Sequence, residues 1–255
     1  MSSFKNKLVF ITGGASGIGK AMAESFAADG AKVCIADISD GTDLAKSIDG
    51  AYYKLDVTSE DNTREVYRTI ENEHGKLDVI CLVAGVALED AILEDLDMDK
   101  ARKMIDINLV GVMLGLKYGT QHMNDGGSII TAGSAAGGGM TVAMQGVYAA
   151  TKAGVHYLTR TVAIEQGGRG IRANTLCPAS IAGTGMMIEE DESSEARFFG
   201  GITALGRMGR PSDVVNMAKF LASDEAGFIT GGEFTVDGGL TAGLSNSLVG
   251  ALWAD

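Results

Sequence analysis

The stretch Thr12-Gly13-Gly14-Ala15-Ser16-Gly17-Ile18-Gly19 decides the fold. It follows the apolar run Lys7–Thr12 and opens the amphipathic segment Ile18–Ala28, so its glycines join an expected strand to an expected helix. Such a turn can let a pyrophosphate approach the backbone and can present free N–H groups at the positive end of a helix. An ordinary tight turn could use the same glycines, so the stretch alone is a weak indication of a dinucleotide site.

Outward from this turn, short apolar runs alternate with longer amphipathic segments, as in stacked βαβ units. The expected strands are Lys7–Thr12, Lys32–Asp37, Ala51–Leu55, Asp78–Ala84, Gly127–Ala132, Ile171–Cys177 and Glu233–Val236. The expected helices are Ile18–Ala28, Glu60–Glu73, Lys100–Met123, Val147–Gln166 and Ser212–Ala222. Several strands are apolar throughout, which is typical of strands buried on both faces. The pattern predicts an α/β fold with a Rossmann-type, doubly wound parallel β-sheet of about seven strands and helices on both faces.

No linker, composition shift or internal repeat divides the chain, so residues 1–255 are expected to form a single domain. The region Thr184–Gly209 fits neither a strand nor a helix pattern and is expected to be a substrate lid. The tail, residues 240–255, carries little charge and more apolar side chains than a solvated terminus needs: Leu244, Leu248, Leu252 and Trp253. It is expected to pack on a neighbouring subunit, with folding back on its own chain as the alternative.

The charge and hydropathy of the chain narrow the range of partners. A formal net charge of -12 repels nucleic-acid phosphates and anionic membranes. No run of about 18 apolar residues and no apolar signal region is present. We therefore expect a cytoplasmic protein that acts on small molecules and binds neither nucleic acid nor membrane.

Cysteine and histidine usage gives no sign of a metal site. The three cysteines are widely spaced in apolar runs, as buried free thiols are: Cys34, Cys81 and Cys177. The three histidines share no ligand spacing with one another or with the cysteines: His74, His122 and His156. No metal site is predicted.

An acidic residue at the end of the second expected strand strengthens the dinucleotide interpretation. Asp37 lies 18 residues beyond Gly19, where a carboxylate can accept hydrogen bonds from the adenosine ribose hydroxyls. A 2′-phosphate would meet like charge there, since Ile38-Ser39-Asp40 supplies no Arg or Lys. The repulsion at 4 Å is roughly 4 kcal/mol at an effective dielectric constant of 20. The sequence favours NAD over NADP as cofactor, although Asp37 could also be a plain turn residue.

The segment Tyr148-Ala149-Ala150-Thr151-Lys152 lies near the start of an expected helix. Positions i and i+4 share one face, so both functional side chains can serve one site. A nearby ammonium, together with a positive nicotinamide ring, would lower the pKa of the phenol from its usual value near 10. Tyr148 could then take an alcohol proton while hydride leaves the same carbon for the nicotinamide. Taken alone, this spacing is common by chance and most often marks a surface helix.

Further motifs follow in a fixed order along the chain. They are Asp56-Val57, Ala84-Gly85, Asn108 within Ile107-Asn108-Leu109-Val110-Gly111, Ser134, Pro178-Ala179-Ser180-Ile181, Thr184 and Asp237-Gly238-Gly239. With the glycine turn and the Tyr148/Lys152 pair, they resemble the short-chain dehydrogenase/reductase family over essentially the whole chain. The resemblance implies an oxidoreductase that transfers hydride between a nicotinamide cofactor and an alcohol or ketone, and it implies a homotetramer.

The resemblance also implies roles for individual residues. Asn108, Ser134, Tyr148 and Lys152 match the catalytic tetrad: Asn108 holds a proton-relay water, Ser134 orients the substrate oxygen, and Lys152 tunes Tyr148 and holds the ribose. The cofactor-binding positions are Gly13, Ser16, Gly17, Ile18, Gly19, Asp37, Ile38, Asp56, Val57, Ala84, Gly85, Tyr148, Lys152, Pro178, Ile181 and Thr184.

The chain departs from the family pattern at four places. Leu82-Val83 replaces the usual pair of asparagines, so a side-chain amide contact there is in doubt. Ala179 replaces a glycine and Thr184 is displaced by about one residue, which leaves the nicotinamide contacts uncertain. Ser134 lies 14 positions before Tyr148, one more than the family pattern, and Gly137-Gly138-Gly139 can absorb the insertion.

The expected substrate site is apolar. Ser134 and Tyr148 are joined there by Met140, Gln145 and Met186, with Val86, Val142, Met144, Met187 and Phe199 around them. This set favours a hydrophobic secondary alcohol or ketone of steroid-like, cyclic or aromatic type, although the methionines could simply fill the core. Two alternatives stay open: an NADPH-linked 3-oxoacyl-carrier reductase, which Asp37 disfavours, and a non-catalytic NAD-binding protein, which would not need the tetrad.

Overall fold

Five buried residues, four of them apolar, form β1 (Leu8–Thr12) near the middle of a parallel sheet. The computed structural model describes residues 4–88, 91–184 and 194–252. The other six strands of the described sheet are β2 (Lys32–Asp37), β3 (Ala51–Lys54), β4 (Leu77–Leu82), β5 (Met123–Ala132), β6 (Arg172–Pro178) and β7 (Glu233–Val236). Their order is β3-β2-β1-β4-β5-β6-β7. The order reverses beside β1, and doubly wound sheets bind ligands at such a switch point.

Two hydrophobic cores lie on opposite faces of this sheet, because successive side chains of a strand alternate between faces. Phe10 enters one core, where its ring meets Tyr67 edge-on with centroids 4.9 Å apart. Its neighbours Val9 and Ile11 enter the other core with Met22 and Phe26. Both cores are made of apolar residues that the strand and helix periodicities predict.

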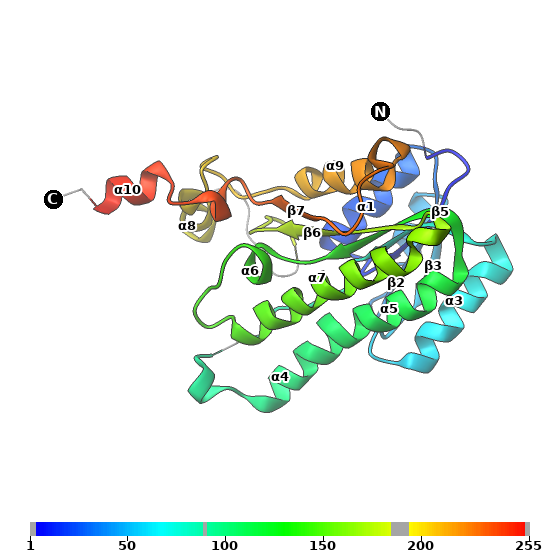
Figure 1. Ribbon diagram of the computed structural model, residues 1–255, viewed down its shortest axis with the longest axis horizontal. Helices are drawn as coiled ribbons and strands as arrows, with labels where there is room; N and C mark the ends of the chain where they lie inside the picture. The colour runs from blue at the N-terminus through cyan, green and yellow to red at the C-terminus, as the bar shows by residue number, and fades with distance from the viewer. Residues whose placement is uncertain (1–3, 89–90, 185–193, 253–255) are drawn as a thin grey trace.

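Helices cover both faces of the sheet (Figure 1). The first face carries α3 (Glu60–His74), α5 (Gly111–Gly119) and α7 (Gly146–Gln166), and the second carries α1 (Gly17–Ala28), α2 (Thr42–Ser47) and α9 (Pro211–Ala222). The predicted single-domain, doubly wound α/β fold is confirmed.

The helix expected over Lys100–Met123 is largely confirmed: helical turns run without a break from Met98 to His122, and only the π-helical turn within them was not expected. The structure has α4 (Met98–Ile105), a π-helical turn over Asp106–Val110, α5, and a short 3₁₀ turn before β5 begins at Met123. Asn108 lies in the wide turn and is fully buried. Its side chain bonds backbone outside the helix, and this non-local contact holds the irregular turn.

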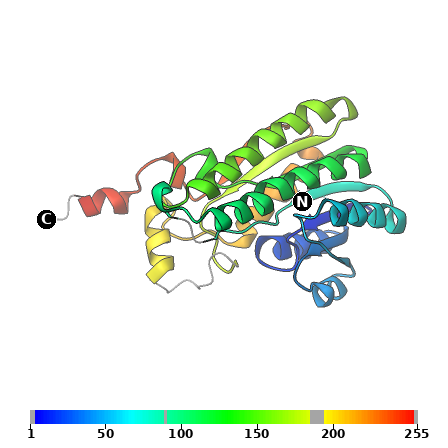
Figure 2. The same ribbon diagram turned by 90° about the horizontal axis from the view of Figure 1, so that it is seen from below.

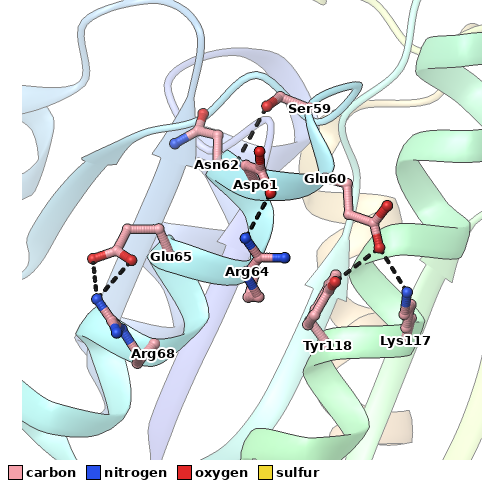
Figure 3. Close-up of polar contacts among 9 residues, drawn as sticks. All are labelled: Ser59, Glu60, Asp61, Asn62, Arg64, Glu65, Arg68, Lys117 and Tyr118. Atoms are coloured by element: carbon pink, nitrogen blue, oxygen red, sulfur yellow. Dashed lines mark hydrogen bonds and ion pairs between the residues drawn. The ribbon is translucent and has the colours of Figure 1, made fainter.

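Polar contacts hold α3 against α5 beside the loop that carries Asp56 and Val57. The Glu60 carboxylate accepts hydrogen bonds from Lys117 Nζ at 2.6 Å and from the Tyr118 hydroxyl at 2.8 Å (Figure 3). Val57 packs directly on α5, since a Cβ at Gly111 would lie 2.9 Å from its Cγ2. The position of this loop is therefore fixed by the helix pair next to it.

The predicted lid region is partly helical. It contains α8 (Ser194–Ile202), and residues 185–193 lie outside the described part of the chain. A further short helix, α6 (Ala135–Gly138), follows β5 and was not expected from the sequence.

The C-terminal segment runs outward from the sheet to α10 (Asn246–Leu252), which lies beside α8 (Figures 1 and 2). Ser245 Oγ donates a hydrogen bond of 2.9 Å to the carbonyl of Gly201 in α8. Leu244 is 70% exposed, Leu248 is half-buried, and Trp253 lies outside the described residues. Packing of this tail on a neighbouring subunit stays a prediction. Within the described ranges, no helix has the length and hydropathy that crossing a membrane requires.

Candidate active site

A cleft of about 430 Å³ opens at the carboxyl ends of the central strands. Most of the residues predicted to bind the cofactor line it: Gly13, Ser16, Gly17, Ile18, Gly19, Asp37, Ile38, Asp56, Val57, Ala84, Gly85 and Thr184. Segments that are far apart in the sequence thus meet at one edge of the sheet, as the βαβ pattern predicts. Tyr148, Lys152, Pro178 and Ile181 are not part of this lining.

The glycine turn fits a phosphate group. Gly13 and Gly17 have φ angles of 67° and 52°, which favour glycine. A Cβ at Gly13 would lie 2.8 Å from Ala84 Cα, and one at Gly19 would lie 2.1 Å from the Gly13 carbonyl oxygen. Ser16 precedes α1, and its side chain does not cap the helix. The turn therefore brings bare backbone and the positive end of α1 to the cleft.

Asp37 joins the glycine turn to the end of β2. Its carboxylate accepts hydrogen bonds from the backbone N–H of Ala15 at 3.1 Å and of Ser39 at 2.9 Å. No salt bridge joins it to a Lys or Arg among the described residues. The negative charge on the cleft wall is thus not neutralised by a side chain, and Ile38 beside it is 65% exposed.

Thr12 bonds the backbone that directly follows β4. The Thr12 hydroxyl accepts hydrogen bonds from the backbone N–H of Val83 at 3.2 Å and of Ala84 at 3.3 Å. This hydroxyl, from the neighbouring strand, anchors the end of β4, where Leu82 and Val83 supply no side-chain amide.

Asn108 and Lys152 meet at Gly85. The amide of Asn108 accepts from the Val86 N–H and donates to the Val86 carbonyl, both at 2.8 Å. A Cβ placed on Gly85 would lie 3.2 Å from Asn108 Oδ1 and 3.3 Å from Lys152 Nζ. Glycine at this position leaves space for both polar side chains beside the cleft.

Lys152 is almost fully buried, and its Nζ donates a hydrogen bond of 2.9 Å to the carbonyl of Ala132. Burial lowers the pKa of Lys152 to about 8, because the charged form loses solvation. The Nζ atom lies 5.7 Å from the centre of the Tyr148 ring. The predicted i, i+4 pair therefore does share one site.

Ser134 is the polar neighbour of the Tyr148 phenol. Burial raises the pKa of Tyr148, and the hydrogen bond from Ser134 acts in the opposite direction. Ser134 Oγ also accepts the backbone N–H of Ala136 at 3.2 Å, which leaves its proton for the phenol. The expected lowering of the Tyr148 pKa is not produced by the protein groups, since burial outweighs the effect of its neighbours.

The remaining predicted residues lie at varied positions. Pro178 ends β6, and Ile181 is buried with its backbone paired to Gly209. The Thr184 hydroxyl donates to the Ile181 carbonyl at 3.0 Å, so Thr184 reaches the cleft despite its displacement in sequence. Contacts of Pro178 and Ile181 with a cofactor stay predictions.

The predicted substrate residues are only partly brought together. Met140 is half-buried and lines a separate groove of about 410 Å³ between the Gly137–Gly139 segment and α7. Gln145 is exposed and directly precedes α7. Met186 and Met187 lie outside the described residues. Their contact with substrate stays a prediction.

One group of polar residues was missed by the sequence analysis. His156, Cys177 and Glu233 come from α7, β6 and β7, and one potential ligand atom of each lies within 4.8 Å of the others. Spacing along the chain gives no signal for a group assembled from three elements. The side chains bond one another, and Arg160 pairs with the same carboxylate, so the group is a hydrogen-bonded chain in this structure.

Comparison with known proteins places these features in a family. Residues 13–241 match the family model described as enoyl-(acyl carrier protein) reductase. The chain is 37% identical over 251 residues to cis-4-hydroxycyclohexanecarboxylate dehydrogenase of Sinomonas cyclohexanicum, covering 94% of this chain and 98% of the relative. It is also 37% identical over 254 residues to 3-alpha-(or 20-beta)-hydroxysteroid dehydrogenase of Mycobacterium bovis, covering 96% and 94%.

A solved structure gives the same result. A short-chain type dehydrogenase/reductase from Mycobacterium ulcerans superposes with a TM-score of 0.89 at 32% identity, over 95% of this chain and 92% of that one. The fold, the cleft and the sequence matches agree. The chain belongs to the short-chain dehydrogenase/reductase family, whose members are alcohol dehydrogenase-type oxidoreductases that bind a nicotinamide cofactor.

Proposed function

We propose that this protein is an NAD-dependent dehydrogenase that interconverts a hydrophobic cyclic secondary alcohol and its ketone, with Tyr148 as general acid and base. The observation that carries this proposal is the convergence of Ser134, Tyr148 and Lys152 beside the cleft that holds the glycine turn. A protein that only bound the cofactor would not need a buried lysine next to a phenol and a serine hydroxyl.

Tyr148 is set up as a proton donor for ketone reduction. Its raised pKa keeps the phenol protonated at neutral pH, and the hydrogen bond from Ser134 stabilises the phenolate that proton donation would leave. In alcohol oxidation the same oxygen accepts the hydroxyl proton, which requires the phenolate. We therefore expect oxidation to become faster with rising pH.

Lys152 and Asn108 support this proton exchange. The Lys152 ammonium lies within reach of the phenol ring and stabilises a phenolate electrostatically. With a pKa of about 8 it can also pass a proton without a large energetic cost near neutral pH. Asn108 keeps the neighbouring backbone of Val86 in place and so maintains the space at Gly85 that Lys152 Nζ borders.

NAD is the cofactor that the cleft favours. The glycine turn would hold the pyrophosphate, Asp37 the adenosine ribose, and Ile38 the adenine, while Asp56 and Val57 close the cleft beyond it. When bound, the nicotinamide ring would accept or donate the hydride. Asp37 carries its charge without a cationic partner among the described residues, so a 2′-phosphate would be repelled.

The substrate class follows from the site and from the relatives together. Both curated relatives reported above are named for alcohols on saturated rings, a cyclohexane and a steroid. The candidate substrate positions Met140 and Met144 are apolar and flexible, which suits a bulky hydrocarbon. A ring-borne secondary alcohol is therefore the proposed substrate.

The test is a panel of cyclic secondary alcohols and ketones, assayed with NAD and with NADP by nicotinamide absorbance. The account predicts turnover of ring substrates with NAD and at least about tenfold lower kcat/KM with NADP. Open-chain primary alcohols of matched carbon number are the control. Preference for NADP would overturn the cofactor assignment, and absence of any turnover across the panel would overturn the proposed substrate class.

Self-association is the proposed assembly state. The exposed Leu244 and the outward course of α10 leave apolar surface that a partner subunit of the expected homotetramer would cover. Light scattering of the full chain, beside a variant truncated after Gly239, tests this. A monomeric full-length protein would contradict it.

A further inference from the structure

A chain of buried polar groups lies behind the proposed catalytic serine. His156 follows Lys152 by one turn of α7 and is 2% exposed. Its Nε2 lies 3.5 Å from Cys177 Sγ, and its Nδ1 lies 3.2 Å from Glu233 Oε2. The other oxygen of Glu233 pairs with Arg160 at 2.7 Å. Both ring nitrogens of His156 are therefore engaged.

The chemistry of Glu233 fixes the direction of this chain. An ionised carboxylate only accepts hydrogen bonds, so His156 Nδ1 must donate to it. In the neutral ring Nε2 is then an acceptor, and the thiol of Cys177 donates to it. Burial lowers the pKa of His156 and raises the pKa of Cys177 to about 12, so both groups stay uncharged.

This series of buried polar groups ends at the backbone of Ser134. The backbone N–H groups of Ser134 and of Phe234 in β7 lie beside Cys177 Sγ and oppose the rise of its pKa. The sulfur thus donates its one proton to His156 and lies against the Ser134 backbone. The backbone of the serine that bonds Tyr148 is held by a side chain from β6.

Close packing also links His156 to the backbone next to Ser134. A Cβ at Gly133 would lie 2.3 Å from His156 Nε2, and one at Gly138 would lie 2.7 Å from His156 Cε1. The imidazole therefore lies against the backbone just before α6, the short helix that Ser134 caps, and at the last residue of that helix. The ring occupies the space that side chains at these two positions would need.

From these contacts we infer that Cys177 and His156 are positioning residues, which hold Ser134 so that its hydroxyl points at Tyr148. The inference rests on the proposed function of Ser134 and Tyr148 and adds to it two residues outside the tetrad. Neither residue touches the reacting atoms. Glu233 sets the tautomer of His156. His156 in turn orients the thiol of Cys177, which lies against the Ser134 backbone.

The main experiment compares three cysteine variants by kcat, KM and NADH affinity. Cys177→Ala removes the thiol and with it the contacts to His156 and to the Ser134 backbone, and it should lower kcat about tenfold, with the dissociation constant for NADH unchanged within about twofold. Cys177→Ser retains a donor and an acceptor, so its kcat should be at least about threefold higher than that of Cys177→Ala. The matched control is Cys81→Ala, a buried thiol of β4 whose raised pKa reflects burial alone. An equal loss of kcat in the Cys81 and Cys177 variants would overturn the inference.

A double-mutant cycle separates this inference from the proposed function itself. In a Ser134→Ala background, Cys177→Ala should cost less than about twofold further, because its effect passes through Ser134. The same tenfold loss in both backgrounds would show that Cys177 acts elsewhere. Full activity of Ser134→Ala alone would instead refute the proposed role of Ser134.

A milder variant covers the case in which Cys177→Ala does not fold. Glu233 is partly exposed, and Glu233→Gln can donate to His156 Nδ1, which turns Nε2 into a donor that competes with Ser134 for the sulfur. This variant should lower kcat about threefold while NADH affinity is retained. Wild-type kcat in Glu233→Gln would contradict the proposed role of His156 and Cys177 in positioning Ser134.

Discussion

Asn108 closes a pair of hydrogen bonds with the backbone of Val86, both 2.8 Å long, across the end of the cofactor cleft. The amide is fully buried and lies in the π-helical turn between α4 and α5. This pair fixes the segment after β4 to the helix that carries Asn108. It also holds that segment beside Lys152, since Gly85 is next to both side chains.

Asn108→Leu should therefore reduce both stability and activity. The Val86 N–H and carbonyl would lose their partners, and we expect the free energy of unfolding to fall by about 2 to 4 kcal/mol. Urea denaturation measures this, with Asn72→Leu on the exposed face of α3 as control. Equal denaturation midpoints for the two variants would contradict the structural role of Asn108.

Asp37→Ser should weaken the preference for NAD. The substitution removes the charge that would repel a 2′-phosphate, and the ratio of kcat/KM for NAD to that for NADP should fall by about 10- to 100-fold. Steady-state kinetics with both cofactors provide the measurement. Asp40→Ser, three residues further on in the same loop, is the control and should leave the ratio unchanged.

Gly19→Ala should abolish cofactor binding or prevent folding. The added Cβ would lie 2.1 Å from the backbone oxygen of Gly13, a clash that no side-chain rotation can relieve. Titration of NADH fluorescence tests binding, and circular dichroism tests folding. Gly167→Ala, which meets no atom within 4 Å, is the matched control and should bind NADH normally. Normal binding by Gly19→Ala would show that the turn has another conformation.

Lys152→Met should stabilise the fold at neutral pH while removing activity. Burial lowers the pKa of Lys152 from 10.5 to about 8, a difference of 10.5 − 8 that corresponds to about 3 kcal/mol. Loss of the hydrogen bond to Ala132 offsets roughly 1 kcal/mol of this gain. The unfolded chain holds the proton between pH 8 and 10 while the folded chain releases it, so wild-type stability rises over that range.

Denaturation of both proteins at pH 7 and at pH 9.5 gives the comparison. The variant should be more stable at pH 7, and the difference should shrink at pH 9.5. A variant that is less stable than the wild type at both values would show that Lys152 is not strained by burial.

Features that depend on local sequence could be predicted. All seven expected strands are present, because each is a short apolar run between Gly, Asp or Ser residues. The glycine turn reaches the cleft since Gly13, Gly17 and Gly19 are needed for backbone reasons alone. Tyr148 and Lys152 share a site because one helical turn separates them.

Features that depend on contacts between distant parts of the sequence could not be predicted. The wide turn at Asn108 exists because Val86, 22 residues earlier, offers a backbone N–H and carbonyl. The pKa of Tyr148 is set by burial, which its own segment does not reveal. The contact of His156 with Cys177 joins α7 to β6 across 21 residues and leaves no periodic signal.

The most direct test of the central claim is Tyr148→Phe, which removes the phenolic oxygen and keeps the ring. NADH should bind with a dissociation constant within about twofold of the wild type, while kcat for the best cyclic alcohol should fall by at least about 100-fold. Retention of wild-type kcat by Tyr148→Phe would contradict the assignment of Tyr148 as the acid and base of this enzyme.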